Sequence, residues 1–174
     1  MALAVAAGPA AAAQDDPRLA PLFAKLKAPQ SAEDAKQTEA QIWEIWGENK
    51  DAETARLMQH GIAAMAGDDE DEALEAFGEA VKRDARFAEA WNKRATIEFA
   101  LGDFEASVAD IERTLALEPR HFGALAGLGQ IYLALDRKKA ALKAFRAALA
   151  INPHLDGVRA KIAELEKDVE GDPI

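Results

Sequence analysis

The chain has 174 residues, enough for one domain with a sizeable core, and 49% of them are apolar. A formal net charge of −10 argues against nucleic acid as a partner, because phosphate contacts need clustered lysine and arginine. The absence of cysteine excludes a structural disulfide, a thiolate metal site and a lipoprotein anchor.

Residues 1–14 resemble a secretory signal peptide. They carry no charged side chain, and a short apolar run is followed by a Gly-Pro break and by small residues at Ala11–Ala13, which fit an A-x-A cleavage site. The run is too short to cross a membrane. We therefore expect cleavage near Ala13 and a mature protein that begins at Gln14 or Asp15, in the periplasm or outside the cell. The alternative is an alanine-rich leader on a cytoplasmic protein.

Residues 15–53 are predicted to form a helical hairpin. Apolar residues at helical spacing indicate the first helix, and Pro29 stops the pattern. The second helix begins at a capping box in which Ser31 binds the backbone of Asp34, and it ends at Gly47. The apolar positions are Leu19, Leu22, Phe23 and Leu26 in the first helix, and Ala35, Ile42, Trp43, Ile45 and Trp46 in the second.

Two interpretations of this hairpin stay open. In the first interpretation the hairpin is a degenerate repeat, because Trp46 falls one repeat length before Ala80 and terminal repeats are expected to be atypical. Alternatively, it is an unrelated hairpin used as a cap. Both interpretations place Trp43 and Trp46 against the first full repeat.

Residues 54–155 contain one helix–turn–helix unit three times, at 54–87, 88–121 and 122–155. Pro119 and Pro153 are 34 residues apart, and self-similarity at this period indicates stacked helical repeats. Small residues that let helices approach recur at equivalent places, and large residues fill the gaps between them. The small positions are Gly61, Ala95, Gly129, Ala73, Ser107, Ala141, Ala80, Thr114 and Ala148, and the large ones include Phe77, Trp91, Leu125 and Phe145.

The last predicted helix covers residues 156–170. Val158, Ile162, Leu165 and Val169 form an apolar stripe on it, and the opposite face is charged. A helix with a polar back that closes the end of a stack is what the solubility of an open array requires.

The third repeat carries a pattern that resembles the tetratricopeptide repeat. The matching residues are Leu125, Leu128, Gly129, Tyr132, Ala141, Phe145 and Pro153, and the second repeat adds Trp91 and Pro119. The resemblance implies an all-α fold, a right-handed α-solenoid of three helix pairs with a degenerate N-terminal hairpin and a C-terminal capping helix. Together with the export-like start, the chain resembles small exported bacterial tetratricopeptide proteins.

No catalytic residue, metal site or cofactor site is predicted, so the chain is not expected to be an enzyme. His60, His121 and His154 do not share a helix face, and metal binding needs ligands that converge. The five acidic residues after Gly67 suit the positive end of a helix dipole, and they lack the spaced ligands of a calcium loop.

The resemblance also implies that the first helices of successive repeats line a concave groove that holds a peptide or helix of another protein. Asn92 lies at the centre of this groove and could bond the ligand backbone, whereas Arg94 is interpreted as structural and paired with Glu75 or Glu79. The partner-binding positions are Met58, Ile62 and Met65, then Asn92, Thr96 and Phe99, then Ala126, Gln130 and Leu133.

The leading hypothesis is therefore a non-enzymatic interaction module, an adaptor or assembly factor with a protein partner, no nucleic acid and no membrane span. The alternative is a self-assembling structural protein that buries the groove, or Trp43 and Trp46, in a homodimer. A subclass of the family clamps the C-terminal carboxylate of chaperones with basic and asparagine side chains. Only Lys93 fits that pattern here, so this function is not expected.

Overall fold

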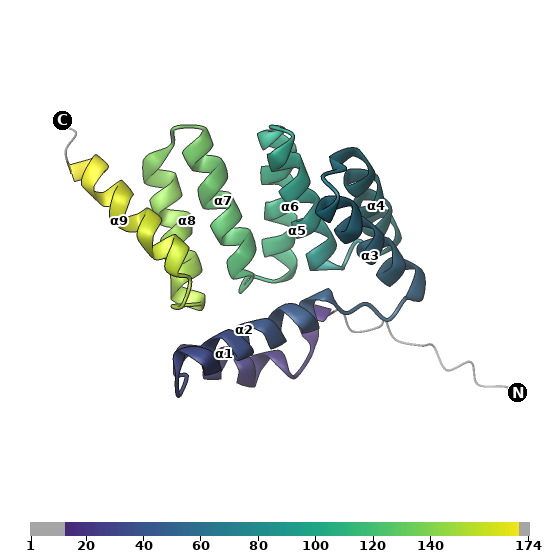
Figure 1. Ribbon diagram of the computed structural model, residues 1–174, viewed down its shortest axis with the longest axis horizontal. Helices are drawn as coiled ribbons and strands as arrows, with labels where there is room; N and C mark the ends of the chain where they lie inside the picture. Colours follow the sequence, from purple (N-terminus) through teal and green to yellow (C-terminus); the bar gives the residue numbers. More distant parts are fainter. Residues whose placement is uncertain (1–12, 171–174) are drawn as a thin grey trace, which may run out of the picture.

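The computed structural model describes residues 13–170 and is helical throughout that range (Figure 1). This confirms the predicted all-α solenoid. A short 3₁₀ turn, Ala13–Asp15, precedes the helices α1 (Leu19–Lys27), α2 (Ala32–Gly47), α3 (Ala52–Ala66), α4 (Glu70–Arg83), α5 (Ala88–Ala100), α6 (Phe104–Leu117), α7 (Phe122–Ala134), α8 (Lys138–Ile151) and α9 (Asp156–Glu170). The predicted leader falls on residues 1–14, of which residues 1–12 lie outside the described residues.

The turn inside each helix pair is built in the same way. Asp68, Gly102 and Asp136 have φ values of 56°, 80° and 55°, and these three residues are 34 apart. This left-handed conformation reverses the chain, and glycine and aspartate are among the residues that tolerate it. In the first two pairs an aspartate directly after this residue caps the second helix, since Asp69 accepts from the backbone N–H of Glu72 and Asp103 from that of Ala106.

Within each pair a small residue on the first helix faces a large residue on the second. A Cβ atom added at Gly61 would lie 2.6 Å from the Phe77 ring, and one added at Gly129 would lie 2.4 Å from the Phe145 ring. The second repeat has Ala95 at the same place, and there the opposing residue is the smaller Ile111. Helix approach is thus matched to side-chain volume in each pair.

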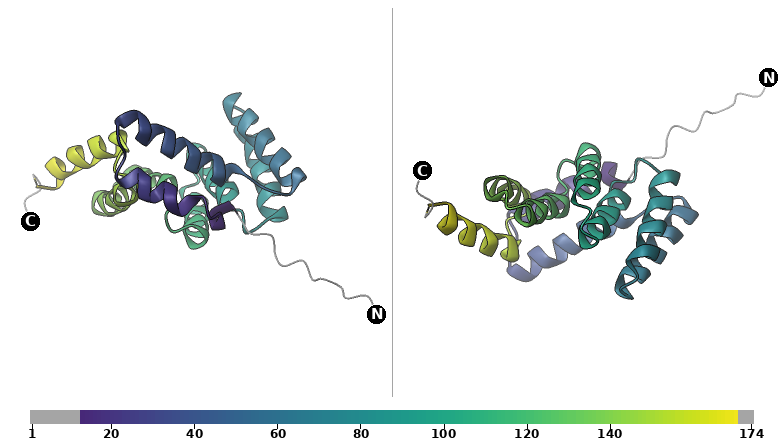
Figure 2. Two further views of the ribbon diagram at one scale, coloured as in Figure 1. Left: turned by 90° about the horizontal axis from the view of Figure 1, so that it is seen from below. Right: turned by 90° about the horizontal axis from the view of Figure 1, so that it is seen from above.

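The hairpin of α1 and α2 lies across the lower ends of α5, α7 and α8 rather than in line with α3 and α4 (Figure 1). Its second helix does begin at Ser31, whose hydroxyl accepts from Asp34 N, and it ends at Gly47 as predicted. Seen from below, the hairpin lies in front of the repeats (Figure 2).

The expectation that Trp43 and Trp46 pack against the first repeat is wrong. The Trp46 ring stacks on His121 with centroids 4.2 Å apart, and the Trp43 ring meets Phe122 edge-on at 5.3 Å. Both contacts lie where the second repeat passes into the third. The reason is that the hairpin turns away from the stack and buries its apolar face on the turns between repeats, where Phe122, Ile151 and Leu155 join its core.

At the other end, α9 follows α8 and shields it from solvent. Ile162 and Leu165 are buried against Ala141, Leu142 and Phe145 of α8. Within residues 13–170, no helix is long and apolar enough to cross a membrane.

Candidate functional site

One residue per repeat forms an exposed row on the first helices. Ile62 on α3, Thr96 on α5 and Gln130 on α7 are 34 residues apart, and all three are exposed. Ile62 is 47% exposed. The row therefore presents an apolar side chain, a hydroxyl and an amide in sequence along the stack.

Four other predicted positions are half-buried: Met65, Phe99, Ala126 and Leu133. Phe99 packs on Phe104 with ring centroids 5.6 Å apart, Met65 packs against the core of the first repeat, and Leu133 packs against the core of the third. These residues flank the exposed row and offer a partner only part of their surface.

Met58 and Asn92 are buried, at 3% and 8% exposure. Met58 belongs to the core cluster around Phe77. The Asn92 side chain donates to a carboxylate oxygen of Glu89 at 3.1 Å, because that buried carboxylate needs hydrogen-bond donors. In this structure Asn92 is engaged inside the molecule and does not reach a ligand backbone.

Glu89 links α5 to the turn that leads into α7. Its carboxylate also accepts from His121 Nε2 at 2.9 Å, and Lys93 Nζ lies 3.4 Å from its other oxygen. Burial by itself would raise the pKa of Glu89, but the hydrogen bond from His121 and the nearby Lys93 ammonium outweigh burial and hold that pKa below its ordinary value. Lys93 also lies 5.9 Å from the centre of the Trp43 ring, so this lysine is occupied on two sides.

Arg94 has a structural role, but the predicted partners Glu75 and Glu79 are wrong. Its guanidinium binds both carboxylate oxygens of Asp110 on α6, at 2.6 and 2.7 Å. Asp110 is nearer because it lies in the second helix of the same repeat. With two parallel hydrogen bonds, this is a bidentate arginine–carboxylate ion pair, which is stronger than a hydrogen bond between neutral groups.

Glu98 lies one helical turn after Arg94 and is 8% exposed. Among the described residues, its Oε2 atom has no hydrogen-bond partner. Burial and the neighbouring Asp110 carboxylate raise the pKa of Glu98 to about 7, against the opposing effect of Arg94.

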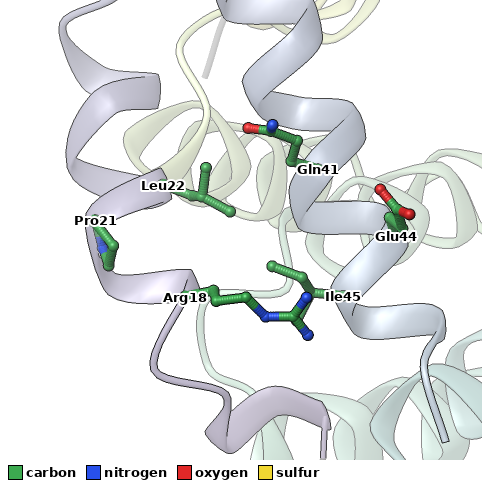
Figure 3. A pocket seen from close by; sticks show the side chains of 6 residues that line it. All are labelled: Arg18, Pro21, Leu22, Gln41, Glu44 and Ile45. Atoms are coloured by element: carbon green, nitrogen blue, oxygen red, sulfur yellow. The ribbon is translucent and has the colours of Figure 1, made fainter.

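The hairpin carries an open pocket of about 370 Å³ that the sequence did not suggest. Leu22 and Ile45 form its apolar floor, and Gln41 and Glu44 line the α2 side (Figure 3). Arg18 and Pro21 complete the lining from the α1 side. The only sequence signal was the amphipathic pattern of the two helices, from which Leu22 and Ile45 were both expected in the core.

No group of His, Cys, Asp or Glu suited to a metal ion occurs in residues 13–170. His60 pairs with Glu72 at 2.8 Å on the surface, whereas His121 and His154 lie in equivalent turns between repeats. Each histidine thus has a separate local partner, and the three do not converge.

Two independent sequence comparisons bear on this architecture. A model of the tetratricopeptide repeat matches residues 58–109 and 92–156. A TPR repeat-containing protein of Rhizobium etli is 35% identical over 136 residues, covering 78% of this chain and 67% of that protein. The Hsp70-Hsp90 organizing protein 1 of Glycine max is 28% identical over 105 residues, and the match spans only 18% of its length.

Solved structures share the fold. The first TPR domain of Spaghetti (RPAP3), bound to an HSP90 peptide, superposes with a TM-score of 0.66 at 18% identity, covering 68% of this chain and 94% of that one. MamA superposes with a TM-score of 0.64 at 18% identity, covering 85% and 84%. At these identities the likeness concerns the fold.

Proposed function

The chain belongs to the tetratricopeptide repeat family, and from that premise we propose that it is a non-enzymatic protein–protein interaction module. It acts as an adaptor or assembly factor that binds a peptide or helix of another protein on its first helices. The first TPR domain of Spaghetti (RPAP3), solved with a bound HSP90 peptide, and the TPR2B domain of yeast Sti1, solved in an Hsp70 complex, support a protein as the partner class.

The observation that carries the proposal is the exposed row of Ile62, Thr96 and Gln130. Residues at equivalent positions of successive repeats are equally spaced along the stack. They therefore suit an extended or helical ligand that runs along it. The half-buried Met65, Phe99 and Leu133 add apolar surface beside this row. A methionine in such a surface adapts to different ligand shapes.

The partner is not proposed to be a chaperone C-terminus. Clamping a terminal carboxylate requires free cationic and amide side chains. Lys93 is the one residue that fits the pattern, and it already lies 3.4 Å from Glu89 and beside the Trp43 ring. Asn92, its neighbour, donates to the same Glu89 carboxylate.

The competing hypothesis is self-assembly through an apolar surface. The tryptophans do not favour it, because Trp46 is 1% exposed and Trp43 is half-buried against the repeats of its own chain. Among the described residues, the large exposed apolar side chains through which two copies could associate are Ile62, Leu101 and Leu135. A mass measurement in dilute solution separates the hypotheses, because the interaction module is expected to be monomeric.

The test is a crosslinked pull-down from the native compartment with two single substitutions. Thr96→Arg places a large charge in the exposed row, and Ala109→Arg places the same charge at an exposed position on α6, the second helix of the same repeat. We expect Thr96→Arg to lose partners that wild type and Ala109→Arg both retain. Identical partner profiles for the two variants would remove the row from the binding surface.

We also propose that the protein acts in the periplasm or outside the cell. The support is the uncharged, alanine-rich segment that ends at Ala13. N-terminal sequencing of native material is expected to begin at Gln14 or Asp15, and recovery of Met1 would contradict export with cleavage.

A further inference from the structure

The hairpin meets the three repeats at equivalent places. Asp84, Glu118 and Asn152 are 34 residues apart, and each precedes the turn that leads out of its repeat. Asn49, just beyond α2, donates to Asp84 at 2.9 Å. The Trp46 indole N–H donates to Glu118 at 3.4 Å, and Asn152 donates to Glu39 at 3.0 Å.

The contacts follow one another in order along this segment. Glu39 meets the third repeat, Trp46 the second and Asn49 the first. Glu39 and Trp46 are seven residues apart, which corresponds to about 10 Å of helix rise. The helix therefore runs along the stack, and its chain direction is opposite to the order of the repeats.

The first half of the hairpin contacts a second set of equivalent residues, Arg86, Arg120 and His154. Gln14 donates to the Arg86 carbonyl at 2.9 Å. The Arg120 guanidinium lies 4.6 Å from the centre of the Phe23 ring. His154 donates through Nε2 to the carbonyl of Leu26 at 3.0 Å. The second and third repeats are thus contacted from both α1 and α2, and the first repeat is contacted from the two segments that flank these helices, through Gln14 and Asn49.

These contacts are buried or partly buried. Glu118, Asn152 and Trp46 are buried, whereas Asp84, Asn49 and Glu39 are half-buried. A buried polar group is costly without its partner, so each contact favours one spacing of the hairpin over its repeat. In an open solenoid each repeat otherwise contacts only the repeats next to it. Small rotations between successive repeats therefore accumulate along the stack.

We propose that the hairpin of α1 and α2 is a strap that fixes the spacing and curvature of the three repeats. Asn49, Trp46 and Glu39 are its positioning residues, one for each repeat. The strap sets the separation of Ile62, Thr96 and Gln130, and with it the length of ligand that the exposed row accepts. It would hold the repeats in the same way if that row bound nothing.

The strap is tested by measuring distances between repeats. Ala66, Ala100 and Ala134 are exposed, lie at the ends of α3, α5 and α7, and share one phase. Because the natural chain has no cysteine, pairs of these residues can be changed to cysteine and spin-labelled without interference. Pulsed dipolar spectroscopy of the full chain then gives the separation of the first and second repeats, and of the second and third.

Substitution of Asn49 or of Glu39 is expected to change one inter-repeat distance and leave the other unchanged. Asn49→Ala should broaden and shift the Ala66–Ala100 distance while the Ala100–Ala134 distance keeps its wild-type distribution. Glu39→Ala should do the reverse. Glu44→Ala is the control, since Glu44 is exposed and lines the pocket between α1 and α2 (Figure 3).

A merely stabilising role has a different outcome. If the hairpin only adds stability, Asn49→Ala and Glu39→Ala lower the melting temperature but leave both distance distributions unchanged at low temperature, and that result overturns the strap. If Trp46→Ala fails to fold, the two polar substitutions still decide the question, because each removes one hydrogen bond to a repeat and otherwise only one hydrogen bond outside the repeats, to Asp51 N for Asn49 and from Trp43 for Glu39. Equal broadening of both distances by either substitution would also contradict the one-residue-per-repeat arrangement.

Discussion

Trp46 and His121 lie face to face, with ring centroids 4.2 Å apart and an interplanar angle of 9°. The His121 Nδ1 atom accepts from the backbone N–H of Ala124 at 3.0 Å, so the proton of the neutral ring is on Nε2, which points to Glu89. One histidine therefore caps α7, satisfies a buried carboxylate of α5 and supports the hairpin.

This arrangement predicts a large cost for His121→Ala. The substitution leaves the buried Glu89 carboxylate without one of its hydrogen-bond donors, which costs about 1–3 kcal/mol or more for a charged group, and it removes the cap of α7, which costs about 1 kcal/mol. His60→Ala is the matched control, because His60 pairs with Glu72 on the surface, where such pairs contribute about 0–1 kcal/mol. Urea unfolding measures both free energies. Equal losses for the two variants would show that the buried network contributes nothing.

Two glycines of α7 are predicted to respond in opposite ways to alanine. A Cβ atom at Gly129 would lie 2.4 Å from the Phe145 ring, whereas one at Gly127 would meet only the end of Ile111, at 3.6 Å. Gly129→Ala should destabilise by about 1–3 kcal/mol through overpacking. Gly127→Ala should be neutral or stabilise by about 0.5–1 kcal/mol, because alanine is the better helix former. Thermal unfolding of both variants checks the register, and a stable Gly129→Ala protein would contradict it.

The sequence alone was enough to place the repeats, because their packing depends on contacts one period apart. The sequence separation of Gly61 from Phe77 is the same as that of Gly129 from Phe145. The structure places each glycine in contact with its phenylalanine. The exposed positions Ile62, Thr96 and Gln130 follow from the same period.

The hairpin could not be placed in this way, because its contacts depend on direction rather than period. The phase of Trp43 and Trp46 suggested a further repeat. No sequence pattern indicates that the hairpin before Asp51 lies across the stack and not in line with it. The available signal was a different one. Asp84, Glu118 and Asn152 are polar at one phase and are half- or fully buried. Each accepts from the backbone N–H two residues later and also bonds a residue from outside the repeats. The burial of Asn92 was also missed, and in the structure its partner Glu89 is itself buried.

The turn within the second repeat predicts a cost for removing one glycine. Gly102 has φ of 80°, a conformation that costs a residue with a side chain about 1–2 kcal/mol. Gly102→Ala should therefore lower the free energy of unfolding by about that amount, although a Cβ atom there would meet nothing within 4 Å. Gly78→Ala in α4 also meets nothing, but its backbone is helical, so it should stabilise by about 0.5–1 kcal/mol. Chemical denaturation of the pair separates backbone strain from packing, and similar effects of both changes would rule strain out.

The raised pKa of Glu98 predicts that this carboxyl stabilises the fold at low pH and not at neutral pH, unlike most carboxylates in folded proteins. Burial, followed by the charge of Asp110, raises the pKa of Glu98 in the folded chain to about 7 from an ordinary value of 4.5. The folded state therefore binds a proton more tightly than the unfolded state does. Stability from this group is fully present below pH 4.5 and is lost as the pH rises through 7. At about 1.4 kcal/mol for each pH unit, the loss over this window is on the order of 3 kcal/mol.

Glu98→Gln tests this assignment, because glutamine keeps the shape of the protonated acid and does not titrate. The wild-type free energy of unfolding should fall between pH 4.5 and 7 relative to that of the variant, and the two curves should converge toward low pH. At pH 8 the variant is expected to be the more stable protein, since the unpaired Oε2 is no longer part of a carboxylate. Glu105→Gln, an exposed position on α6, is the control and should follow wild type throughout. Parallel curves for wild type and Glu98→Gln would mean that Glu98 is ionised in the folded chain across this range and is held by Arg94, 3.6 Å away.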